Sequence, residues 1–149
     1  MSNQTLIRAQ NLCLGYDELV INKANFAFES NDFIFITGKS GSGKSTLLKS
    51  LYGALEPLSG QLEVCGSLLS DISNLELLSL RQQIGIIFQD YKLVENMSVY
   101  DNVALVLKMI GIKDKKEISK RVDYILEQVG MYRYRKRPVS ALSGGERQR

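Results

Sequence analysis

The sequence predicts an α/β fold with a parallel sheet, and two observations lead to it. Strand-like apolar runs alternate with helix-like stripes along the chain, and two of these runs, residues 33–37 and 84–88, are almost wholly apolar. Such runs are typical of parallel strands that are covered on both faces. The first run leads directly into a glycine-rich turn and a helix, which is the strand–loop–helix order of this fold class.

The first part of the chain predicts sheet interrupted by one helix. Alternating apolar residues over 6–14 predict a first strand, residues 26–28 belong to a second, and Asn31 and Asp32 form the turn that follows it. After the apolar run at 33–37, residues 45–52 have helical composition with their leucines on one side. Residues 60–64 then predict a further short strand that follows a turn.

Three helices are predicted in the middle and second half of the chain. Residues 74–83 carry a short helical pattern, and two longer stripes repeat apolar residues at i, i+4, i+7, i+8 and i+11 over 99–110 and 118–129. Ser98 and Asp114 stand where capping residues of the two longer helices are expected. Two glycines close these helices, namely Gly111 and Gly130. Ordinary core packing explains both stripes.

The composition narrows the possible chemistry. With 149 residues, 44% of them hydrophobic, and a net charge of +3, the chain has the composition of one soluble globular domain. It contains no histidine, which excludes zinc enzymes and hydrolases built on that residue. Two cysteines are too few to staple the fold, the start of the chain is polar, and no apolar run approaches a membrane span. We therefore expect a cytoplasmic chain.

Positive charge is concentrated near the end of the chain. After Gly130 there are six basic residues and one acidic residue, a net +5, so the preceding 130 residues carry a net charge of −2. A general attraction to nucleic acid is therefore not expected. The basic residues from Arg133 to Arg137 are most simply a solvated loop face, the alternative being a contact with phosphate or lipid.

Residues 38–45, Gly-Lys-Ser-Gly-Ser-Gly-Lys-Ser, match the P-loop pattern G-x-x-x-x-G-K-[ST] between a strand and a helix. The glycines allow successive N–H groups to point into one concavity, and the positive end of the helix dipole adds to the attraction for phosphate. Lys44 would supply charge for the β- and γ-phosphates, Ser45 a ligand for Mg²⁺, and Thr46 a contact on the α-phosphate side. The predicted nucleotide-binding residues are Gly38, Lys39, Ser40, Gly41, Ser42, Gly43, Lys44, Ser45 and Thr46.

A second glycine pair opens a helix near the end of the chain and defines a second candidate anion site. Preceded by Leu142 and followed by Arg147-Gln-Arg149, it reads L-S-G-G-x-x-x-R; its members are Ser143, Gly144, Gly145 and Glu146. Together with the P-loop and Gln89, this sequence resembles the signature of the ATP-binding cassette (ABC) family. The resemblance spans the chain and implies an ABC-type nucleotide-binding domain. Residues 1–149 would be its N-terminal part, with an antiparallel β subdomain, a partial parallel core and a helical subdomain.

The resemblance also implies roles for individual residues. Tyr16 matches the aromatic residue that stacks on adenine. Gln89 matches the Q-loop glutamine, which contacts Mg²⁺ and the attacking water and relays the nucleotide state to the membrane partner, and Lys44 and Gln89 would be the catalytic residues present. The signature residues 143–146 would close on the ATP of the opposite subunit. The resemblance therefore implies a homodimer that holds ATP and Mg²⁺ between its two copies.

For the parent protein, the resemblance implies an ATP hydrolase that couples ATP to an integral membrane partner and lies on the inner face of the membrane. The alternatives are a nucleotide-dependent dimerising switch with little hydrolysis, and a soluble cassette acting in DNA repair or on ribosomes. The family's Walker B aspartate, catalytic glutamate and switch histidine follow the signature and are not among these 149 residues. We therefore expect that this chain does not hydrolyse ATP by itself.

Overall fold

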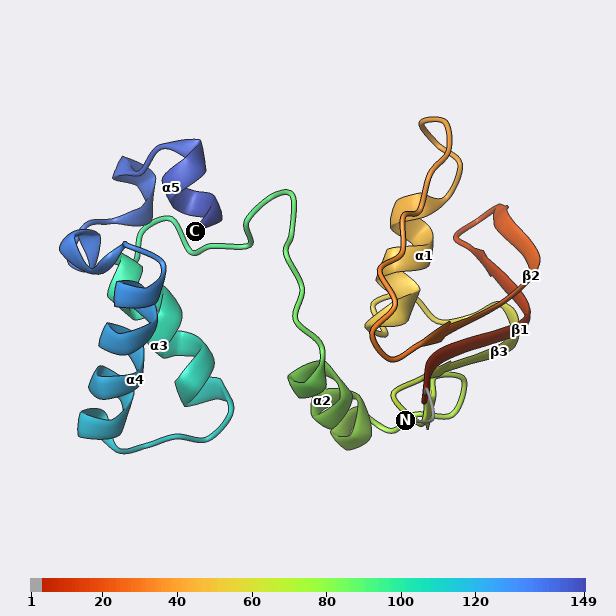
Figure 1. The fold of residues 1–149 in the computed structure, drawn as a ribbon, viewed down its shortest axis with the longest axis horizontal. Coiled ribbons are helices and arrows are strands. Elements are labelled where there is room, and N and C mark those ends of the chain that lie inside the picture. The colour runs from red at the N-terminus through yellow and green to blue at the C-terminus, as the bar shows by residue number, and fades with distance from the viewer. Residues whose placement is uncertain (1–3) are drawn as a thin grey trace. The chain divides into compact units, whose positions relative to one another are not determined.

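The computed structural model describes residues 4–149, so the first three residues of the polar start lie outside the description. Two compact units are present, and they divide between Ile86 and Ile87. The N-terminal unit contains β1 (Thr5–Gly15), β2 (Leu19–Glu29), α1 (Lys44–Leu51), β3 (Ser59–Val64), β4 (Ser67–Leu68) and α2 (Asn74–Gln83) (Figure 1). The C-terminal unit contains α3 (Val99–Met109), α4 (Lys115–Gln128), the 3-10 turns η1 (Tyr132–Tyr134) and η2 (Val139–Ala141), and α5 (Gly144–Gln148).

The strands form one antiparallel sheet in the order β2-β1-β3-β4. Ile7 on β1 lies opposite Phe28 on one side and Val64 on the other, which fixes the register of the three long strands. The strands expected over 6–14, 26–28 and 60–64 are confirmed, and β2 starts earlier than expected because its pairing with β1 extends to Leu19. A register shift between Gln10 and Cys13 marks a bulge in β1.

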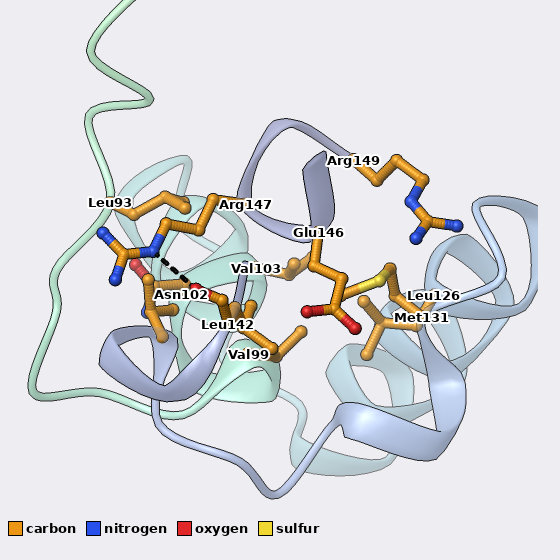
Figure 2. A pocket seen from close by; sticks show the side chains of 11 residues that line it. Leu93, Val99, Asn102, Val103, Leu126, Met131, Leu142, Glu146, Arg147 and Arg149 are labelled. Carbon is orange, nitrogen blue, oxygen red and sulfur yellow. Dashed lines mark hydrogen bonds between the residues drawn. The ribbon is translucent and has the colours of Figure 1, made fainter. Parts of the chain in front are cut away.

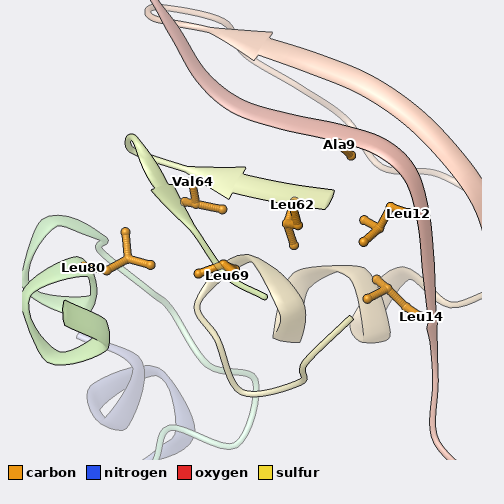
Figure 3. Close-up of a cluster of buried hydrophobic side chains, with 7 residues drawn as sticks. All are labelled: Ala9, Leu12, Leu14, Leu62, Val64, Leu69 and Leu80. Carbon is orange, nitrogen blue, oxygen red and sulfur yellow. The ribbon is translucent and has the colours of Figure 1, made fainter. Parts of the chain in front are cut away.

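The core of the N-terminal unit lies between the sheet and α1. Leu12 and Leu14 from β1 and Leu62 from β3 are fully buried, and Figure 3 shows their side chains on the α1 side of the strands. Leu47 and Leu51 of α1 pack against this cluster, as expected, whereas Leu48, expected on the same side, is 50% exposed. Burial of each leucine stabilises the fold by roughly 1.5–3 kcal/mol. This packing fixes α1 against β1.

The two strands expected at 33–37 and 84–88 are not present. Both segments run without strand pairing, and Phe33, Phe35 and Ile87 are 84%, 79% and 86% exposed. A wholly apolar strand is stable only when neighbouring strands satisfy both of its edges and helices cover its faces, and no strand among residues 4–149 pairs with either segment. The prediction of parallel strands at these positions is therefore wrong for the described chain, whose sheet is antiparallel throughout.

The C-terminal unit is helical, as the stripes predict, but core packing does not account for the whole stripes, because Val106, Ile110 and Ile125 are exposed. Ala104 of α3 and Val122 and Leu126 of α4 are buried in one cluster with Met131. The expected caps are confirmed, because the Ser98 side chain accepts the N–H of Asp101 at 3.0 Å and the Asp114 side chain accepts the N–H of Lys116 at 2.9 Å. Both closing glycines adopt positive φ, at Gly111 (+95°) and Gly130 (+67°).

Candidate functional site

The glycine loop of the N-terminal unit leads directly into α1. Gly43 is the N-cap of this helix with φ +91°, in the left-handed region that favours glycine. A Cβ at this position would lie 2.8 Å from Cγ1 of Val20 and 3.2 Å from Cγ1 of Ile21, because β2 presses against the start of the helix. The space and the backbone conformation therefore both require glycine here.

Lys44 closes the glycine loop. Its Nζ donates to the carbonyl oxygens of Gly38 at 2.9 Å and Lys39 at 2.8 Å, so the ammonium group lies over the loop. The loop is also tied by the N–H of Ser42, which donates to the Lys39 carbonyl oxygen at 3.2 Å. The charge that the sequence assigns to phosphate binding is thus located at the loop itself.

The N-terminus of α1 carries no internal acceptor for its first N–H groups. Gly43 has no side chain to cap them, and the first turn contains no acidic residue. Ser45 is exposed at the same end of the helix, whereas Thr46 is buried at 8% exposure. Unpaired N–H donors, the helix dipole and the Lys44 ammonium group together fit an anion such as a phosphate group.

Tyr16 follows β1 at the edge of the same unit and is 55% exposed. Its hydroxyl accepts a hydrogen bond from Nζ of Lys49 at 3.1 Å, and this Nζ lies 5.6 Å from the ring centroid. Lys49 belongs to α1, so the contact links the exposed aromatic ring to the P-loop helix. Sequence reasoning missed Lys49, because a contact between residues 33 positions apart leaves no local pattern.

Gln89 lies in the C-terminal unit, exposed in a turn that follows the 84–88 segment. In the residues that follow, Lys92 and Asp90 form an ion pair with an N–O distance of 2.7 Å, and this pairing lowers the pKa of the Asp90 carboxyl. Asn102 of α3 holds the next part of the loop, since its Oδ1 accepts the N–H of Val94 at 2.8 Å and its Nδ2 donates to the Val94 carbonyl at 3.1 Å. Asn102 is a second positioning residue that the sequence did not indicate.

Ser143 is the N-cap of α5 and forms a capping box with Glu146. The Ser143 N–H donates to the Glu146 carboxylate at 2.8 Å, and the Ser143 hydroxyl accepts the N–H of Glu146 at 3.4 Å. The pKa of Glu146 is lowered by the Ser143 N–H, then by the Ser143 hydroxyl, and then by a hydrogen bond from Tyr134. The carboxylate is therefore held in its charged, accepting form at the start of the helix.

Within the C-terminal unit, the signature lies against the loop that follows Gln89. A Cβ on Gly144 would be 3.4 Å from the Tyr91 hydroxyl, and Nη1 of Arg147 lies 3.4 Å from Oε1 of Glu95. Figure 2 shows the Arg147 side chain reaching back to Leu142, whose carbonyl oxygen accepts its Nε–H at 3.2 Å. Leu142, Glu146 and Arg147 are among the residues that line a pocket of about 90 Å³. The structure thus brings the predicted signature residues together with the segment that carries Gln89.

The predicted site residues fall into two groups, one in each unit. Residues 38–46 and Tyr16 lie in the N-terminal unit, and Gln89 and residues 143–146 lie in the C-terminal unit. Within residues 4–149, no three histidine, cysteine, aspartate or glutamate side chains cluster as metal ligands. No helix over the same residues has the length and apolar character needed to cross a membrane.

A glycine loop that opens an uncapped helix and is closed by a lysine defines the class of P-loop nucleotide-binding proteins. Residues 21–149 match the sequence model of the family described as "ABC transporter". The chain belongs to this family.

Several curated proteins are similar to the chain. They include the phosphate import ATP-binding protein PstB of Saccharolobus solfataricus, 38% identical over 89% of this chain and 54% of that protein. The cell division ATP-binding protein FtsE of Mycobacterium tuberculosis is 39% identical over 87% of this chain and 56% of that protein. The methionine import ATP-binding protein MetN 1 of Pectobacterium atrosepticum is 37% identical over 97% of this chain and 44% of that protein. The chain thus spans about half the length of these relatives.

Among solved structures, the dimeric ATP-binding cassette MJ0796 in a post-hydrolysis state bound to ADP and Pi matches with a TM-score of 0.82. The identity is 26%, and the match covers 95% of this chain and 65% of that one. These matches confirm the ABC-type α/β fold class expected from the sequence.

Proposed function

We propose that the chain binds ATP with Mg²⁺ through residues 38–46 and serves as the ATP-binding part of an ABC-type membrane complex. The observation that carries the proposal is the geometry at the start of α1. Lys44 lies 2.9 Å and 2.8 Å from the two loop carbonyls, beside first-turn N–H groups that no side chain caps. When bound, ATP would supply the anhydride bond whose hydrolysis drives such complexes. The chain's own residues hold the phosphates and, through Ser45, one Mg²⁺ ligand.

Nucleotide binding is tested with a fluorescent ATP analogue and the full chain. Lys44→Ala removes the loop charge, so we expect affinity to fall by at least ~10-fold. Lys115→Ala is the matched control, because Lys115 is an exposed lysine at the first position of α4 in the other unit. Equal affinity in the Lys44→Ala variant and the parent would refute the proposal. In Ser45→Ala, the affinity should lose its dependence on Mg²⁺ while nucleotide binding persists.

Roles for the other predicted site residues, in both units, follow from the same proposal. Tyr16 would stack on adenine, Gln89 would sense Mg²⁺ and water, and residues 143–146 would contact the ATP held by a second copy of the chain. Sedimentation with and without ATP tests the dimer, and Gly145→Asp is expected to abolish nucleotide-dependent dimerisation. Gly145 is a suitable position because nothing lies within 4 Å of an added Cβ, so the change leaves the fold of the unit unstrained.

The membrane partner is proposed from two segments, residues 38–53 and 86–103. These look most like the cell-division protein FtsE, which implies an FtsX-like permease as the partner, a location on the inner face of the plasma membrane, and control of cell-wall hydrolases. Relatives named for phosphate and methionine import lie in the same range of identity, 37–38% against 34–39% for FtsE. The alternative is the ATPase of a lipoprotein-release or macrolide-type exporter. Co-purification of the full-length protein with each kind of permease distinguishes these possibilities.

Hydrolysis is proposed for the full-length protein and not for these 149 residues, which contain neither the Walker B aspartate nor the catalytic glutamate of the family. Phosphate release by the full-length protein, abolished by Lys44→Ala, would support the ATPase. ATP-dependent dimerisation without turnover would instead support a nucleotide-dependent switch. Phosphate release by residues 1–149 alone that is sensitive to Lys44→Ala would contradict the expectation for this chain.

A further inference from the structure

A basic and aromatic segment of the C-terminal unit lies outside the roles proposed above. Residues 132–137, here named the Tyr–Arg face, contain Arg133, Arg135, Lys136 and Arg137 and no acidic residue. The ion pairs among residues 4–149 are made by other basic side chains, namely Lys92, Arg121 and Arg147. The four positive charges of the Tyr–Arg face are thus not compensated by ion pairs within the described chain.

Tyrosine rings hold the arginines of the Tyr–Arg face. The guanidinium carbons of Arg133 and Arg137 lie 4.6 Å and 4.8 Å from the centroid of the Tyr134 ring, and that of Arg135 lies 4.2 Å from the Tyr132 ring. Tyr134 is half-buried and packs against the core of the unit. Stacking on a fixed ring restricts the arginine rotamers while leaving the N–H groups at the guanidinium edges available to a partner.

The backbone of the Tyr–Arg face is also fixed. The carbonyl oxygens of Arg137 and Arg135 accept the N–H groups of Val99 and Tyr100 at 3.0 Å and 2.9 Å, which are first-turn donors of α3. The N–H of Arg137 in turn donates to the Tyr134 carbonyl at 2.8 Å. The charged side chains therefore project from a backbone that is tied to a helix, and a partner would find them already ordered.

We propose that the Tyr–Arg face binds an acidic segment of a partner polypeptide through Arg133, Arg135 and Arg137. Planar guanidinium groups in fixed positions match carboxylates, which accept two parallel hydrogen bonds from each. A fluid layer of lipid headgroups requires no such order, and an element that lies on a membrane normally presents several apolar side chains. Tyr132 is the one exposed large hydrophobic side chain of the Tyr–Arg face, and 36% of its surface is accessible to solvent. The geometry thus favours a polypeptide over a lipid surface.

The proposed surface adjoins the signature through one side chain. Tyr134, whose ring holds Arg133 and Arg137, also helps to lower the pKa of the Glu146 carboxyl in the capping box. An acidic partner on the Tyr–Arg face would therefore lie one side chain away from the start of α5. This surface is independent of ATP binding at residues 38–46, so its test does not depend on nucleotide.

Binding is tested by the fluorescence anisotropy of a labelled oligoglutamate peptide with the full chain at low salt. Arg133→Gln with Arg137→Gln should weaken binding by at least ~10-fold. The matched control is Lys115→Gln with Lys116→Gln, which removes the same charge from exposed positions of α4 and should change affinity by less than ~2-fold. Arg133→Lys with Arg137→Lys keeps the charge and loses the planar stacking, so it should weaken binding by at least ~3-fold.

Three outcomes would overturn the proposal. The first is an equal loss of affinity in the Arg133→Gln, Arg137→Gln double variant and in the Lys115→Gln, Lys116→Gln control, which would mean that the peptide responds to net charge alone. The second is unchanged affinity in the arginine-to-lysine variant, which would mean that guanidinium geometry is irrelevant. The third is arginine-dependent binding to phosphatidylglycerol vesicles without peptide binding, which would identify lipid as the occupant. Far-UV circular dichroism of each variant verifies that the chain remains folded.

Discussion

Gly60 is a position at which the structure predicts a large effect of a single added methyl group. It lies in β3 opposite the bulge of β1 with φ +81°, and a Cβ there would be 2.2 Å from the Asn11 carbonyl oxygen and 2.5 Å from the Asn11 carbonyl carbon. The obstacles are backbone atoms, which no rotamer change can move. Gly66 at the β3–β4 turn has the same backbone conformation, φ +80°, but nothing within 4 Å of an added Cβ.

The magnitude follows from comparing these two glycines. The left-handed conformation costs an alanine about 1–2 kcal/mol at either position. At Gly60, β1 and β3 must also separate by roughly 1 Å to reach ordinary contact, which weakens the pairing around Gln10↔Gln61 and Cys13↔Ser59. Loss of two such hydrogen bonds costs about 1 kcal/mol each. We therefore expect Gly60→Ala to lower the free energy of unfolding by about 3–4 kcal/mol, against about 1–2 kcal/mol for Gly66→Ala.

Urea denaturation of the full chain, followed by far-UV circular dichroism, measures both variants. With a slope of about 1–3 kcal/mol per molar urea, the difference of about 2 kcal/mol should separate the two midpoints by roughly 1 M. Coincident midpoints would refute the reasoning, because they would mean that the bulge relaxes at no cost. A lower midpoint for Gly66→Ala than for Gly60→Ala would refute it more strongly.

Three further predictions concern other contacts. Ser143→Ala should raise the pKa of the Glu146 carboxyl in an NMR titration. In the parent chain the folded-state pKa of this carboxyl is depressed, so the ionised carboxylate stabilises the fold fully above about pH 4.3, the unfolded-state pKa. This stabilisation is lost as the pH falls through the lower folded-state pKa. Leu62→Ala should cost about 2–5 kcal/mol in urea denaturation, because this side chain is fully buried. Asn102→Ala should cost about 1–3 kcal/mol and increase amide exchange at Val94, whose N–H it holds at 2.8 Å.

Local chemistry made much of the fold predictable from sequence. The helix at 74–83, expected from its helical pattern alone, is found with the expected bounds, and a capping box between Ser73 and Glu76 at its start accounts for where it begins. The P-loop helix begins where its glycines permit, and the caps at Ser98 and Asp114 hold the two long helices. In each case the signal and the structure it specifies lie within a few residues of each other.

The failures concern partners that are distant in sequence. Residues 33–37 carry the composition of a buried strand, but composition does not state which strand will pair with it, and without a neighbour Phe33 is 84% exposed. The contacts of Lys49 with Tyr16 and of Asn102 with Val94 likewise join residues that no periodic pattern relates. Only packing of the elements brings these side chains together.

The two capping boxes of the chain are alike in their serine and glutamate and differ in the two residues that follow the cap. Ser73 and Ser143 make the same bonds, each N–H donating to the glutamate three residues later at 2.9 Å and 2.8 Å. In α2 the residues after the cap include Leu75, whose bulky side chain shares the first turn with the N–H groups. In α5 the same positions are glycines, and nothing lies within 4 Å of an added Cβ at Gly145. Side chains therefore cover the first-turn N–H groups of α5 less than those of α2, and an open helix start is what the phosphate contact proposed for the signature requires.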